Sequence, residues 1–167
     1  MKKIFYILII YLFKFNFAYS LIEVDITRGN LDPLPIAVSP LHVDVKSDDY
    51  QDIKVKSLGD LISSVVEKNF KSTGLFNPLN KDAFVQKPDI AHLKPRFEDW
   101  SLITAQALVT GKILVKDQKL KIEFRLWDIA ANKEMIALAF TTTPSNWRRV
   151  AHIISDKIYE RLTGETG

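Results

Sequence analysis

Apolar and polar residues alternate with the period of a β-strand in the second half of this chain. The alternation is clearest in residues 119–129, where one set of positions is apolar and the positions between them are mostly charged. The apolar set is Leu120, Ile122, Phe124 and Leu126, and the other set is Lys121, Glu123, Arg125 and Trp127. This pattern predicts a strand with one dry face and one wet face. Segments 107–116 and 134–142 flank it across turns at Asp117-Gln118 and residues 130–133, so the three predict an antiparallel meander.

Shorter segments complete the expected sheet. Residues 36–38 form an apolar run between prolines, which is typical of a buried strand, and residues 75–79 predict another brief strand. Residues 42–56 mix acidic and basic side chains without a period, so we expect a solvated loop there. Residues 97–105 predict a short helix that begins with acidic side chains and buries Trp100.

Two long helices are expected. Apolar residues in 58–72 recur at helical spacing and Gly74 supplies a stop, while a last helix begins at Pro144, after Thr143 as the candidate N-cap, and ends at Gly164. Two amphipathic helices against such strands predict an α/β (α+β) fold. We expect a two-layer domain with a mixed sheet of about five strands and two long helices.

The first twenty residues have the pattern of a secretory signal peptide. A basic start at Lys2 and Lys3 precedes an apolar run of ten residues, and Ala18 and Ser20 are small residues before a candidate cleavage site. A membrane span needs about twenty apolar residues, so we expect cleavage after Ser20 and no permanent membrane anchor. An uncleaved anchor is the alternative, and Lys14 fits a signal peptide poorly.

After the leader, the chain divides into an arm, a linker and one domain. Residues 21–29 alternate through Ile22, Val24 and Ile26, which predicts a strand, and the proline-rich residues up to 35 predict a linker. We therefore expect a signal peptide at 1–20, an arm and linker at 21–35, the domain at 36–164 and a tail at 165–167.

Removing the leader changes the charge of the chain. The 167 residues include 23 Lys and Arg against 20 Asp and Glu. Lys2, Lys3 and Lys14 lie in the leader and no acidic residue does, so the remainder has 20 of each sign. This balance argues against nucleic acid as a partner, because phosphate binding needs an excess or clustering of Lys and Arg. The sequence contains no cysteine, which excludes a disulfide framework and a lipid anchor on a thiol.

No catalytic or metal-binding motif stands out. The histidines, His42, His92 and His152, lie in different segments, and no serine lies in a nucleophile elbow. The Asp48, Asp49 and Asp52 cluster lacks the spacing and glycine of a calcium loop. We therefore expect no cofactor and no enzymatic activity. A periplasmic hydrolase stays as an alternative, which a deep pocket joining histidines with carboxylates would favour.

Six segments in order resemble the N-terminal domain of the TolB family, the periplasmic component of the Tol-Pal envelope system. These segments are IEVDITRG at 22–29, PIAVSPL at 35–41, SLGDLISSVVEKNFKSTGLFNPL at 57–79, ALVTGKI at 107–113, FRLWDI at 124–129 and WRRVAHIISDKIYERLTG at 147–164. The departures are mild: Leu41 replaces a frequent Phe, and residues 104–106 replace a Gly-Ala-Asp-like approach to a strand. The resemblance implies a fold similar to anticodon-binding domains.

The resemblance also implies a partner and the residues that bind it. In the family, the segment that follows signal cleavage engages the inner-membrane protein TolA, and it is exposed or sequestered according to the occupancy of a β-propeller. The corresponding residues here are Leu21, Ile22, Glu23, Val24, Asp25, Ile26, Thr27, Arg28 and Gly29. Addition of this arm to the edge of a partner's sheet fits its strand period. The alternative is an ordinary edge strand of the domain itself.

A propeller that would bind the lipoprotein Pal follows this domain in the family, and no such segment follows residue 164 here. We therefore expect a truncated or split reading frame, with Pal as a partner only if a propeller is supplied elsewhere. The implied function is an adaptor for outer-membrane integrity and constriction during cell division. An activator of peptidoglycan synthesis, which would bind a penicillin-binding protein instead of TolA, is the related alternative.

Overall fold

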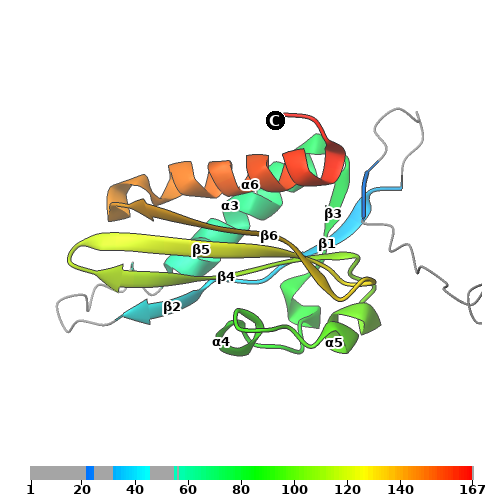
Figure 1. Ribbon diagram of the computed structural model, residues 1–167, viewed down its shortest axis with the longest axis horizontal. Coiled ribbons are helices and arrows are strands. Elements are labelled where there is room, and N and C mark those ends of the chain that lie inside the picture. The colour runs from blue at the N-terminus through cyan, green and yellow to red at the C-terminus, as the bar shows by residue number, and fades with distance from the viewer. Residues whose placement is uncertain (1–21, 25–31, 46–54, 56, 167) are drawn as a thin grey trace, which may run out of the picture.

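A central ten-residue strand, β4 (Ala107–Lys116), organises the sheet. The computed structural model describes residues 22–24, 32–45, 55 and 57–166. Strand β4 pairs antiparallel with β5 (Lys119–Asp128), which pairs antiparallel with β6 (Lys133–Thr142). Asp117 and Gln118 both have positive φ, as a tight two-residue hairpin turn requires. The predicted meander and its first turn are confirmed (Figure 1).

The other strands are parallel to β4. Strand β1 (Leu34–Val38) lies between β4 and β3 (Phe76–Pro78), and β2 (His42–Val45) pairs with β4 further along. The prediction of a loop from residue 42 onward is therefore wrong for residues 42–45. These residues form a strand because β4 supplies backbone partners that the local charge pattern does not reveal, and all four are half-buried.

Strands β1 and β2 occupy successive positions along the same side of β4. Val38 of β1 is opposite Val109 and His42 of β2 is opposite Lys112. The three residues 39–41 that connect β1 to β2 therefore lie opposite only two residues of β4, 110 and 111. This extra residue bends the path as a bulge does. The six strands therefore fill five positions across the sheet, which agrees with the expected number of about five.

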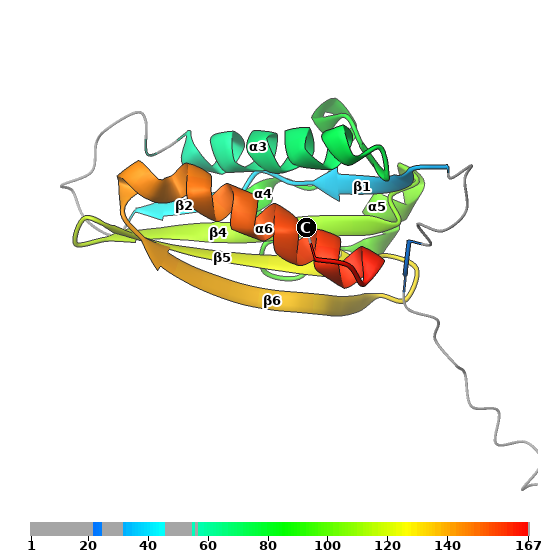
Figure 2. The ribbon, with the colours of Figure 1, turned by 90° about the horizontal axis from the view of Figure 1, so that it is seen from above.

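Both long helices cover one face of the sheet. They are α3 (Leu58–Thr73) and α6 (Trp147–Thr163), and they lie side by side in Figures 1 and 2. Each ends at a glycine with positive φ, Gly74 and Gly164, as predicted. The 3₁₀ turn η2 (Pro144–Asn146) precedes α6. At the start of α3, a side-chain carbon on Gly59 would lie 2.0 Å from the backbone oxygen of Leu41, so only glycine fits there.

Short helices cover part of the opposite face (Figure 1). Strand β3 is followed by η1 (Lys81–Ala83), α4 (Pro88–Ala91) and α5 (Phe97–Leu102). Trp100 is 1% exposed and donates a 2.8 Å hydrogen bond to Gln86, which confirms its predicted burial. Trp127 was expected on the wet face of β5, but this is wrong because Phe97 packs against it and leaves it 7% exposed.

The two faces of the sheet therefore have separate cores. The larger core lies under α3 and α6, and the predicted dry face of β5 contributes all four of its apolar side chains to it. The smaller core, around Trp100 and Trp127, lies under α4 and α5. The predicted signal peptide, at residues 1–20, lies outside the described residues. No helix in the described part of the chain has the length and apolar character needed to cross a bilayer.

Candidate functional site

The described part of the predicted arm, residues 22–24, lies against the body of the same chain. The backbone N–H of Ile22 donates to Oδ2 of Asp128 at 3.2 Å. The backbone N–H of Val24 donates to the carbonyl of Leu162, at the end of α6, at 2.7 Å. Ile22 and Val24 are half-buried against the main core, whereas Glu23 is exposed. The arm therefore touches both the sheet and a helix terminus.

Asp128 is placed to hold this arm by the turn that follows β5. Its other oxygen, Oδ1, accepts a 2.8 Å hydrogen bond from the backbone N–H of Ala131, which fixes the side chain in the β5–β6 turn. The residue is 1% exposed, so its carboxylate depends on these donors in place of water. Sequence reasoning did not identify Asp128, because it is 106 positions from Ile22 along the chain.

The predicted partner-binding residues divide into two groups. Ile22, Glu23 and Val24 are described, and their backbone forms no strand ladder with the sheet. Leu21 and residues 25–29, which include Ile26, lie outside the described residues. In this docked position, Ile22 and Val24, two of the three alternating apolar residues of the arm, contact their own domain.

Two of the three histidines lie together, although they come from different segments. The rings of His42 and His92 stack with 4.7 Å between centroids, and Nδ1 of His92 lies 2.9 Å from the carbonyl of Pro88. A neighbouring open cavity of about 600 Å³ has His42, Asp60 and Asp89 in its wall. The described residues that line it include no Ser, Thr, Cys or Tyr, so they place no hydroxyl or thiol nucleophile beside His42.

The third histidine belongs to a polar contact between the two long helices. Nδ2 of Asn69 lies 2.9 Å from Nδ1 of His152 and 2.9 Å from Oγ of Ser155. The Ser155 hydroxyl donates to the carbonyl of Ala151 at 3.0 Å. The serine proton is thus directed at its own helix and not at His152, so the geometry is that of an interhelical contact.

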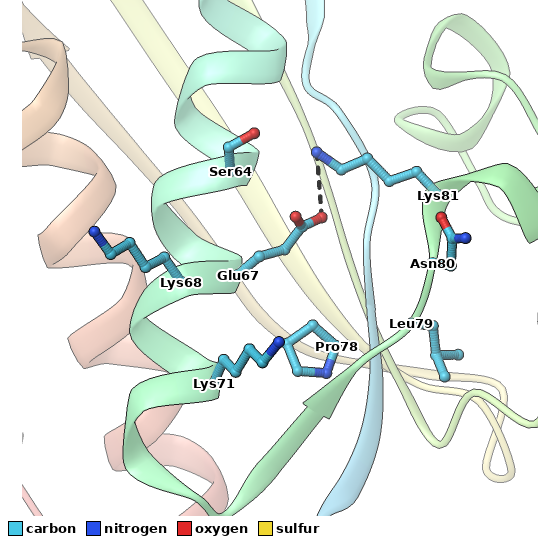
Figure 3. A pocket seen from close by; sticks show the side chains of 8 residues that line it. All are labelled: Ser64, Glu67, Lys68, Lys71, Pro78, Leu79, Asn80 and Lys81. Carbon is cyan, nitrogen blue, oxygen red and sulfur yellow. Dashed lines mark ion pairs between the residues drawn. The ribbon is translucent and has the colours of Figure 1, made fainter.

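A third polar region lies between α3 and the segment after β3 (Figure 3). Glu67 and Lys81 line a cavity of about 440 Å³ and form an ion pair, with 3.2 Å between Oε1 and Nζ. Burial raises the pKa of the Glu67 carboxyl, and the Lys81 ammonium only partly offsets this. Lys81 also donates to the hydroxyl of Ser63 at 2.9 Å. These contacts join two elements, and we assign them a structural role.

No group of three or more His, Cys, Asp or Glu in the described ranges is arranged to hold a metal ion. The docked arm combines the predicted binding residues with defined hydrogen-bond acceptors in the fold. We therefore take the arm, with Asp128 and the carbonyl of Leu162, as the candidate functional site.

Comparison with known proteins shows which family this chain resembles. The family model described as the TolB amino-terminal domain matches residues 22–135. The Tol-Pal system protein TolB of Pelagibacter ubique (strain HTCC1062) is 68% identical over 152 residues, which cover 90% of this chain and 34% of that protein. The crystal structure of TolB from Acinetobacter baumannii shares the fold, with a TM-score of 0.62 and 20% identity over 89% of this chain and 32% of that one.

The chain thus spans about a third of the length of the curated relative that it matches. The match begins at Ile22 and ends at residue 135, so it includes the described part of the arm, strands β1 to β5 and the start of β6. The chain belongs to the TolB family and corresponds to the amino-terminal part of its members.

Proposed function

We propose that this chain is a periplasmic adaptor of the Tol-Pal system that binds a TolA-type inner-membrane partner through its mature amino-terminus. In this role it supports outer-membrane integrity and constriction during cell division, and it acts by binding and not by catalysis. The proposal includes export and cleavage of the leader after Ser20. Family membership supports it, because the 68% identical relative is a Tol-Pal system protein.

The observation that carries the proposal is the way the arm is docked. Two hydrogen bonds, both donated by backbone N–H groups, hold the described residues, and Ile22 and Val24 are only half-buried. A short segment held by two hydrogen bonds and partly buried side chains can leave its own domain and bind the edge of a partner's sheet at a low cost in free energy. The same apolar side chains would serve both positions, so docking to the domain and binding to the partner exclude one another.

The proposal is tested by replacing the apolar face of the arm. We expect the triple variant I22D/V24D/I26D, purified after export, to lose capture by an immobilised TolA-type domain. The charged side chains would be forced into the apolar contacts of the partner's sheet edge. The matched control is Glu23→Ala, because Glu23 is exposed and lies between Ile22 and Val24 in the sequence.

Circular dichroism of the triple variant should match that of the parent chain, since residues 22–24, the described part of the arm, form no ladder with the sheet. Unchanged capture of the TolA-type domain by the triple variant would contradict the proposal. Retention of a penicillin-binding protein in place of the TolA-type domain would select the peptidoglycan-synthesis alternative.

A further inference from the structure

Strand β6 forms one margin of the sheet. Among the described strands it pairs only with β5, and Figure 2 shows it as the outermost strand beside α6. The backbone N–H and C=O groups of alternate residues on such a strand point away from the neighbouring strand and are available to another one. At ten residues, β6 is long for an exposed edge.

The middle of β6 lacks the devices that usually protect an edge. Residues 135–142 contain no charged side chain and no proline, and Ala137, Leu138 and Ala139 are all exposed. Leu138 is 40% exposed, which is unusual for a leucine in an ordered strand. Charges and a register shift occur only near its start, at Lys133 and Glu134 and opposite Leu126/Trp127. The opposite margin differs, because β3 has only three residues and ends in a proline.

The side chains of β6 are matched to one another about Leu138. In an antiparallel pair of two such strands centred on this residue, Leu138 faces its own copy and Ala137 faces Ala139. In the same register Ile136 faces Phe140, so large apolar side chains meet large ones and small side chains meet small ones.

The charges of β6 also fit this register. Lys133 and Glu134 would lie opposite threonines of the other copy, at residues 143 and 142, so no like charges meet. A two-fold contact requires this kind of self-matching, whereas a contact with an unrelated partner does not.

We propose that β6 pairs antiparallel with the β6 strand of a second copy of this chain, forming a two-fold dimer with one continuous sheet. The contact leaves the arm and its anchor at Asp128 unused. It therefore does not depend on the TolA-type interaction, and its failure would leave that proposal standing.

A cysteine cross-link tests the predicted two-fold axis directly. The chain has no native cysteine, so L138C places one thiol per copy at the proposed axis. Facing residues of an antiparallel pair lie at about 4.5–5.5 Å between Cα atoms, within the range that a disulfide spans. Under mild oxidation we expect L138C to form a covalent dimer. The control L102C, on the exposed Leu102 of α5, should form no covalent dimer under the same conditions.

A second experiment uses charge and needs no cross-link. We expect the parent chain to run at twice its monomer mass in light scattering, and A137K/A139K to run as a monomer, because four lysines would meet at the contact. The control L93K/L102K adds the same charge at exposed sites away from β6 and should stay dimeric. Mixing A137K/A139K with A137D/A139D should restore the dimer.

A parent chain that is monomeric at all concentrations, with no cross-link of L138C, would overturn the proposal. A dimer unaffected by A137K/A139K, with circular dichroism unchanged, would overturn it equally, because another surface would then hold the copies together.

Discussion

Asp128 is the residue on which the docked position of the arm depends most directly. Its two carboxylate oxygens accept hydrogen bonds from the backbone N–H groups of Ile22 and Ala131. Because Asp128 is 1% exposed, water cannot replace these donors. An asparagine keeps one acceptor for the turn at Ala131 but presents an N–H₂ group to the N–H of Ile22. The substitution therefore separates the role of Asp128 in the arm from its role in the turn.

We expect Asp128→Asn to release the arm while the domain stays folded. Leaving the Ile22 donor without its acceptor costs about 1–3 kcal/mol of docking free energy. Hydrogen exchange at the Ile22 amide should accelerate, and exchange at the Ala131 amide should stay slow. Equal protection of Ile22 in the variant and the parent would contradict this role of Asp128.

At the scale of elements, much of the fold follows from sequence periodicity. Strands β4 and β5, and helices α3 and α6, lie within a few residues of their predicted bounds, because each pairs a clear period with a turn or glycine stop. Strand β2 was missed because its four residues become half-buried only beside β4. The burial of Trp127 was missed because a single strand does not reveal whether α5 covers its second face.

The ion pair between α3 and the segment after β3 predicts a dependence of stability on pH. Because burial raises the pKa of Glu67 above its ordinary value, the folded chain binds this proton more tightly than the unfolded chain does. The ionised Glu67 carboxyl therefore destabilises the folded chain most at neutral pH. This destabilisation is lost as the pH falls through the raised pKa towards 4.5, the ordinary pKa of a glutamate. We expect the parent chain to gain stability relative to E67Q over this window, as measured by urea unfolding.

Glu123 supplies a control of opposite sign. The hydrogen bond from Lys121 is the main cause that lowers the pKa of its carboxyl, so its contribution is present above the ordinary value and is lost as the pH falls below it. Relative to E123Q, the parent chain should therefore lose stability in acid. The same sign of pH dependence for both variants would contradict the assignment for Glu67.

At the scale of the whole molecule, the fold brings the start and the end of the described chain to one place. The arm at Ile22 and Val24 contacts the end of β5 and the end of α6, so the candidate site depends on residues from three separate parts of the sequence. The sequence predicted the arm from its strand period and its family resemblance. It could not predict the anchor, because Asp128 and Leu162 carry no local signal of a contact with residues 22–24.

The most direct test of the proposed function is calorimetric titration of a TolA-type domain with two forms of the chain. One form is exported and processed, with mass spectrometry expected to show that it begins at Leu21, and the other lacks residues 21–31. Because the sheet and both long helices begin after residue 31, circular dichroism should be the same for both forms. We expect the processed form to bind and the shortened form to give no measurable heat of binding. Equal affinity of the two forms would contradict the central claim that the mature amino-terminus carries the interaction.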